Sequence, residues 1–137
     1  MANYYLQAMP STAKVQIFSF SAECDNYSGM ATHKRDLAAF QNEAPSKSGS
    51  TMRAGLKYVR IAEPLMVCNE NVKNIATQVD GTRYSDLTAI QHDYADMGYV
   101  MWHQLLKTQM YRCHQVRPRV FTLMVLLLRL RQCCALR

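Results

Sequence analysis

The spacing of the apolar residues changes near Asp93, and this change constrains the fold more than any other feature of the sequence. Before Asp93, short segments rich in β-branched and aromatic residues alternate with turn-forming clusters, as is typical of strands. After it, apolar residues recur at helical spacing. Strands followed by helices predict an α+β fold with segregated elements, namely several strands followed by two C-terminal α-helices.

The predicted strands are rich in β-branched or aromatic residues and are bounded by turn-forming residues. They lie at residues 14–20, 51–62, 75–79 and 83–92, with residues 65–68 also extended. The dipeptide Asp80-Gly81 separates the last two strands, and this pair favours a tight hairpin turn. The sheet is therefore predicted to occupy residues 1–93.

Two helices are predicted in residues 94–137. The first runs from residue 94 to about residue 113, and the second from residue 120 to residue 136. Pro118 lies between them, where its ring would interrupt a continuous helix. The length of the chain predicts one domain covering residues 1–137.

Positive charge is concentrated at the C-terminal end of the sequence. The chain has a net charge of +6, and the surplus lies in the Arg-rich end 112–137, which holds six arginines and no acidic residue. Such a segment indicates contact with an anionic partner, usually nucleic acid or a membrane surface, or a solvated basic helix end. The apolar run 120–128 is shorter than the roughly 20 residues that span a bilayer, so no membrane partner is expected.

The sequence shows no familiar catalytic or metal-binding motif. It lacks a Gly-rich phosphate loop, H-E-x-x-H and G-x-S-x-G. Its five cysteines form no C-x-x-C pair, so no metal and no cofactor are expected. A cysteine nucleophile activated by histidine is the remaining enzymatic hypothesis, with Cys68 or Cys113 as the thiol. We expect a non-enzymatic protein with no catalytic residues.

Several short stretches resemble the coat proteins of single-stranded RNA bacteriophages, the levivirus coat protein family. They are Ser11–Val15, Ser50–Ala54, Asp80–Arg83 and Ala95–Gly98. The resemblance implies an antiparallel β-sheet with an N-terminal hairpin followed by two C-terminal α-helices. It further implies an intertwined homodimer that self-assembles into an icosahedral capsid around genomic RNA. It also implies a structural protein of the virion, assembled in the host cytoplasm.

The resemblance places RNA on the inner face of the sheet and a subunit interface on the helices. The candidate RNA-binding residues are Lys57, Arg60, Lys73, Arg83 and Thr88. The candidate dimer-interface residues are Tyr99, Trp102, Leu105 and Leu106. From spacing alone, a solvated sheet face with ordinary surface charge explains the first set better. The alternative function is a cellular RNA-binding or ribosome-associated protein that uses its Arg-rich end.

Overall fold

The computed structural model describes residues 15–25, 27–28, 37–41, 47–78, 81–111 and 117–127. The strands are β1 (Ile17–Ser21), β2 (Met66–Val72), β3 (Tyr99–Lys107) and β4 (Pro118–Leu126). The helices are α2 (Lys47–Ala62) and α3 (Asp86–Asp96), with short 3-10 segments at Lys73–Ala76 and Thr108–Tyr111. Strands and helices thus alternate along most of the described chain.

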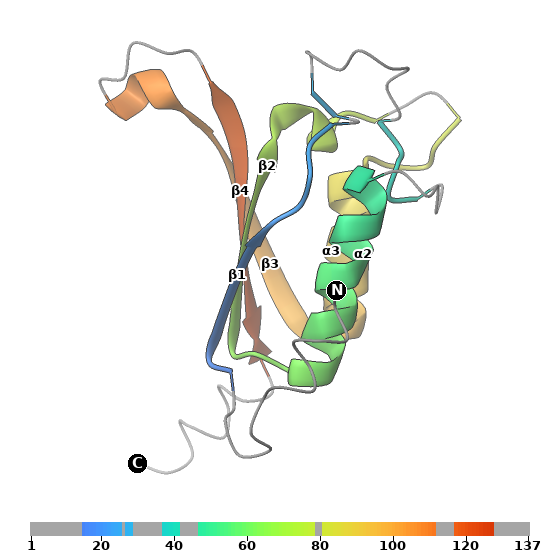
Figure 1. The fold of residues 1–137 in the computed structure, drawn as a ribbon, viewed down its shortest axis with the longest axis vertical. Helices are drawn as coiled ribbons and strands as arrows, with labels where there is room; N and C mark the ends of the chain where they lie inside the picture. Colours follow the sequence, from blue (N-terminus) through green and yellow to red (C-terminus); the bar gives the residue numbers. More distant parts are fainter. Residues whose placement is uncertain are drawn as a thin grey trace.

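The strands form one mixed sheet in the order β1-β2-β4-β3. β1 and β2 are parallel, whereas β4 is antiparallel to both of its neighbours, β2 and β3. The chain passes through α2 between β1 and β2, and through α3 between β2 and β3. Parallel strands need such crossover connections, and a helix usually supplies them. Figure 1 shows both helices on the same side of the sheet.

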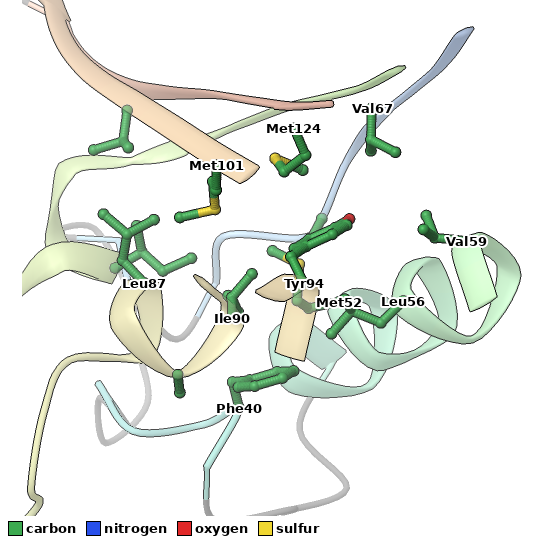
Figure 2. Packing of buried hydrophobic residues seen from close by; sticks show 14 of the residues in the cluster. Phe40, Met52, Leu56, Val59, Val67, Leu87, Ile90, Tyr94, Met101 and Met124 are labelled. Carbon is green, nitrogen blue, oxygen red and sulfur yellow. The ribbon is translucent and has the colours of Figure 1, made fainter. Parts of the chain in front are cut away.

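The hydrophobic core lies between the two helices and one face of the sheet (Figure 2). The helices contribute Met52, Leu56, Val59, Leu87, Ile90 and Tyr94, and the strands contribute Val67, Met101 and Met124. Gly55 lets α2 approach β1 closely, because a Cβ atom there would lie 2.4 Å from the Phe20 ring. The three- and four-residue spacing of the α2 core residues is the pattern of a one-sided amphipathic helix.

No element in the described part of the chain covers the other face of the sheet. Ile17, Trp102, Phe121 and Leu123 are 63%, 55%, 45% and 37% exposed, and strand alternation places them opposite the helices. A groove of about 890 Å³ lies on this face, with Trp102, Phe121 and Leu123 in its lining. Among the described helices, none has the length and apolar character needed to cross a membrane.

The predicted antiparallel sheet with two C-terminal helices is wrong. Strand 14–20 is confirmed as β1 and the extended segment 65–68 as the start of β2. Residues 51–62, predicted as a strand, form most of α2. Their alternation was misleading, since the buried residues recur at helical spacing. The proposed hairpin at residues 75–92 is also absent from the described positions, because a 3-10 segment ends at Ala76, α3 begins at Asp86, and no described residue between them is in a strand.

The division into strands before residue 93 and helices after it is likewise wrong. α3 begins after Ser85, whose hydroxyl accepts a hydrogen bond from the Thr88 backbone N–H at 3.3 Å. It ends at Asp96, and Gly98, two residues later, has a φ of +83° that suits glycine. The apolar residues that follow form β3 and β4. A continuous apolar run fits a buried strand as well as a helix, and residues 128–136 lie outside the described part.

Candidate active site

A cavity of about 390 Å³ lies at the carboxyl ends of β1 and β2. It is lined by Ser21, Ala22, Cys24, Glu70, Asn71, Val72, Arg117 and Arg119. The first three of these residues lie at the end of β1 and in the loop after it, and the next three end β2. Antiparallel β4 begins at the same edge of the sheet. In open α/β sheets, ligands bind outside the carboxyl ends of the strands. This cavity is therefore the candidate functional site.

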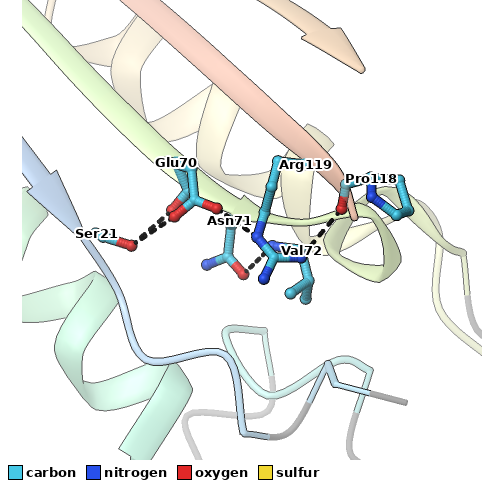
Figure 3. Close-up of polar contacts among 6 residues, drawn as sticks. All are labelled: Ser21, Glu70, Asn71, Val72, Pro118 and Arg119. Atoms are coloured by element: carbon cyan, nitrogen blue, oxygen red, sulfur yellow. Dashed lines mark hydrogen bonds and ion pairs between the residues drawn. The ribbon is translucent and has the colours of Figure 1, made fainter. Parts of the chain in front are cut away.

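Both oxygens of the Glu70 carboxylate are held in place (Figure 3). Arg119 Nε lies 2.6 Å from Oε1, and Ser21 Oγ donates to Oε2 at 3.0 Å. Arg119 also donates from Nη1 to the Pro118 carbonyl oxygen at 3.1 Å. The side chains of Glu70 and Arg119 are 33% and 18% exposed, so the carboxylate is oriented by the protein but still accessible from the cavity.

The sheet register explains why these groups meet. Ser21 on β1 pairs with Glu70 on β2, and Arg119 on β4 pairs with Val72. Residues two apart on a strand share a face, so Glu70 and Val72 point the same way and bring Arg119 beside Glu70. The ion pair thus joins β2 to β4 at the edge that borders the cavity.

Asn71 adds a polar group to the cavity wall. Its side-chain oxygen accepts a hydrogen bond from the Val72 backbone N–H at 2.8 Å. Its amide nitrogen is buried and has no hydrogen-bond partner among the described residues. A buried donor without an acceptor lowers stability, so the Asn71 amide is a group that a bound ligand could satisfy.

Cys24 lies in the loop that follows β1. It is partly buried, forms no disulfide within the described ranges, and lines the cavity. Its carbonyl oxygen accepts hydrogen bonds from the backbone N–H groups of Tyr27 at 3.0 Å and Ser28 at 2.8 Å. These bonds close a turn that fixes the backbone of Cys24. Cys24 is thus a partly accessible thiol in a cavity that two arginines also line.

The cavity therefore combines a thiol, an oriented carboxylate and two arginines. A thiolate is a nucleophile, and a carboxylate can accept a proton or a hydrogen bond. Arginine binds phosphate oxygens well. The arrangement suits nucleophilic attack on a substrate that carries negative charge.

Comparison with known families decides which class of protein this is. Residues 8–127 match the model of the C-5 cytosine-specific DNA methylases. The chain belongs to this family. No curated protein matches its sequence.

Two solved structures share the fold of this methylase-family chain. The Dnmt2 methyltransferase of S. pombe has a TM-score of 0.54 and 13% identity, over 81% of this chain and 29% of that one. The methyltransferase EhMeth of Entamoeba histolytica has a TM-score of 0.56 and 13% identity, over 81% of this chain and 32% of that one. The chain thus spans about a third of the length of these structures.

The family membership overturns the coat-protein resemblance. The C-5 cytosine-specific DNA methylases are a family of enzymes. The prediction of a non-enzymatic capsid protein is therefore wrong. The predicted partner, copies of the chain in a homodimeric shell, and the virion location are wrong as well, since the similar structures are methyltransferases of cellular organisms. The alternative of a ribosome-associated RNA-binding protein is not supported either. The short coat-like stretches are too brief to carry a fold.

The five candidate RNA-binding residues do not share a sheet face. Lys57 and Arg60 lie exposed on α2, and Lys73 begins the 3-10 segment after β2. Arg83 lies in the turn before α3, and Thr88 lies on α3. None of them lines the Cys24 cavity. Their contact with RNA stays a prediction that no comparison tests.

The four candidate interface residues lie on a strand, β3, and not on a helix. Tyr99 is buried, and its hydroxyl donates to the Pro64 carbonyl oxygen at 2.6 Å. Trp102 and Leu105 are exposed and point to opposite faces of the sheet, and Leu106 is half-buried. These residues form no common stripe, and their role in an interface stays a prediction.

The sequence did contain signals of the cavity residues. Cys24 follows closely after the confirmed strand 14–20, at the end where active-site residues of parallel sheets collect. Glu70 lies in β2, two residues after the segment 65–68 that the sequence predicts as extended. Arg117 and Arg119 were noted only as part of the Arg-rich end. Of the thiols considered instead, Cys68 lies within β2, and Cys113 lies outside the described residues.

Proposed function

We propose that this chain carries the cytosine-binding and nucleophile-bearing part of an enzyme that methylates C5 of cytosine in nucleic acid. Cys24 is the proposed nucleophile, and Glu70 is the carboxylate that faces the base. The single observation that supports this assignment most is that both residues line one cavity, at the carboxyl ends of two parallel strands, in a chain of this family.

The chemistry of cytosine explains the need for a thiol. C5 belongs to the aromatic ring and is a weak nucleophile. When the Cys24 thiolate bonds to C6, the C5–C6 π electrons move toward C4 and the C4–N3 π electrons move onto N3, which takes a proton from water. The product is an enamine whose C5 is nucleophilic. Covalent addition of this kind divides one difficult step into two easier ones.

Glu70 is suited to stabilise the adduct. A carboxylate that accepts a hydrogen bond from the newly protonated N3 favours the adduct over the free base. Ser21 and Arg119 hold both of its oxygens, so little reorganisation accompanies the addition. After C5 has gained a new substituent, loss of the C5 proton, expulsion of the Cys24 thiolate and return of the N3 proton to water restore the neutral aromatic ring.

The family name implies a methyl donor, and the described residues do not form a site for one. The 390 Å³ cavity is bordered by the thiol, carboxylate and arginines assigned to the base. Gly49 and Gly55 lie in α2, while Gly81 and Gly98 lie in turns away from β1, so no glycine-rich strand-to-helix turn is present within the described ranges. We therefore derive no step through the donor.

DNA is the proposed substrate because the family description specifies it. Arg117 lies at the cavity beside Arg119, which is paired with Glu70. Guanidinium groups that line the cavity suit the phosphates that flank an extruded cytosine.

The proposal is tested by hydrogen exchange at C5, which needs no methyl donor. In the enamine, C5 takes a proton from water, and elimination then releases the original hydrogen. We expect the purified chain to release tritium from a single-stranded DNA oligonucleotide that contains 5-tritiated deoxycytidine. Cys24→Ser is expected to abolish the release. Cys68→Ser is expected to preserve it, because the Cys68 thiol lies on β2 and does not line this cavity.

Two results would change or reject the proposal. Release from an RNA oligonucleotide but not from DNA would move the substrate to RNA. Absence of release from both would reject the nucleophilic role of Cys24.

A further inference from the structure

Tyr27 joins the Cys24 loop to two other parts of the chain. Its side chain is 1% exposed, and its hydroxyl donates to Asp86 Oδ2 at 2.7 Å. Its carbonyl oxygen accepts from Asn74 Nδ2 at 2.7 Å, and its N–H donates to the Cys24 carbonyl oxygen. The position of Cys24 is therefore linked to the start of α3 and to the segment that follows β2.

Asp86 is a rigid anchor for this link. It is fully buried at the first turn of α3, where the helix dipole favours a negative charge. Besides the Tyr27 hydroxyl, it accepts hydrogen bonds from Phe40 N–H at 2.8 Å and from Gln41 Nε2 at 2.8 Å. A buried carboxylate with this many donors has no freedom to move without losing them.

Asn74 adds a second link, toward Glu70. It lies two residues beyond the end of β2, the strand that carries Glu70. Its bond to the Tyr27 carbonyl oxygen connects the nucleophile loop to the strand of the carboxylate. Glu70 is fixed on the sheet by Ser21 and Arg119, so the placement of Cys24 relative to it depends on Tyr27.

We propose that Asp86 and Tyr27 are positioning residues that set the Cys24 thiol against the base. This inference rests on the proposed function. Neither side chain lines the cavity, so both act through the turn that begins at Cys24. Covalent addition requires the sulfur at bonding range from C6, and a misplacement of about 1 Å lowers such rates by roughly 100-fold.

The test uses Tyr27→Phe, which removes only the hydroxyl that contacts Asp86. Two rates are measured on the full chain: alkylation of Cys24 by iodoacetamide, relative to Cys68 in the same molecules, and tritium release from the DNA oligonucleotide. We expect faster alkylation of Cys24 alone, because its loop is released. We also expect tritium release to fall by about tenfold or more, because the thiol is misplaced.

Tyr99→Phe is the matched control. It also removes one buried tyrosine hydroxyl, which donates to the Pro64 carbonyl oxygen, and it has a similar expected effect on stability. It should leave the Cys24-to-Cys68 alkylation ratio and the rate of tritium release unchanged. A purely structural role of Tyr27 would instead make the two variants behave alike.

The outcomes separate this inference from the proposed function. If the native chain releases tritium and Tyr27→Phe matches Tyr99→Phe in both rates, the positioning role is overturned. It is overturned as well if alkylation of Cys24 and Cys68 rises together. If the native chain releases no tritium, the proposed function fails, while the alkylation ratio still tests the link between Asp86, Tyr27 and Cys24.

Discussion

The two aspartates at opposite ends of α3 have opposite surroundings. Asp86 is buried at the start of the helix and accepts hydrogen bonds from a hydroxyl, an amide side chain and backbone N–H groups. Asp93 lies in the last turns, where the helix dipole disfavours a negative charge. Burial raises the pKa of Asp93, the Arg60 guanidinium lowers it in part, and the nearby Asp96 adds to the rise.

Asp86→Asn is expected to destabilise the fold. The amide keeps one acceptor oxygen but places an NH₂ group against donors that are already buried. Leaving buried polar groups unsatisfied lowers the free energy of unfolding by about 2–3 kcal/mol. Urea denaturation measures the change, and a loss below about 0.5 kcal/mol, typical of surface sites, would show that the hydrogen bonds around Asp86 are not formed.

Asp93→Asn is expected to stabilise the fold at neutral pH. Because the folded-state pKa of Asp93 lies above its ordinary value of 3.8, folding favours the protonated carboxyl. The contribution of Asp93 to stability is therefore present below the ordinary pKa and is lost as pH rises through the raised one. The gain from the substitution should disappear below pH 3.8. Denaturation at both pH values tests this, and an equal gain at both would contradict it.

At the scale of elements, β3 shows how differently the two sheet faces are covered. Met101 is 7% exposed and packs in the core, whereas its neighbour Trp102 is 55% exposed on the uncovered face. Met101→Ala should lower the free energy of unfolding by about 2–5 kcal/mol. Trp102→Gln, a substitution of the neighbouring residue on the uncovered face, should change the free energy of unfolding by about 0.5 kcal/mol at most. A large loss from Trp102→Gln would mean that something covers that face.

The elements that were predicted correctly are the ones with local signals. β1 combines alternation with β-branched and aromatic residues, so its sequence points to one structure. In α2, basic and apolar residues alternate locally, as in a strand. Only the burial of Met52, Leu56 and Val59 in the core shows that this segment follows the helical spacing and forms a helix. In β3 and β4, burial of apolar residues in a sheet outweighs the helical spacing that they share.

At the scale of the whole molecule, the site depends on contacts that no local pattern reveals. Ser21, Glu70 and Arg119 meet because β2 lies between β1 and β4, and this strand order follows from nonlocal pairing. The sequence alone could place Cys24 after a strand and show a cluster of arginines. It could not place them in one cavity, because their distance depends on the register of three strands.

In the proposed function, the thiol, the carboxylate and the arginines of the cavity form one part of a larger catalytic arrangement. The chain spans about a third of the similar methyltransferase structures, and the described residues supply a thiol, a carboxylate and arginines without a donor site. The steps proposed for this chain are therefore those that involve only the base and these side chains.

Covalent capture tests the central claim most directly. In an oligonucleotide with 5-azacytosine, nitrogen replaces C5 and makes C6 more electrophilic, so a thiolate can add without a methyl donor. The account predicts a protein–DNA adduct in the intact mass spectrum, with the oligonucleotide attached to the peptide that contains Cys24, and no adduct for Cys24→Ser. Glu70→Gln should slow its formation. Attachment at Cys68, or no adduct with DNA or RNA, would contradict the assignment of Cys24 as the nucleophile.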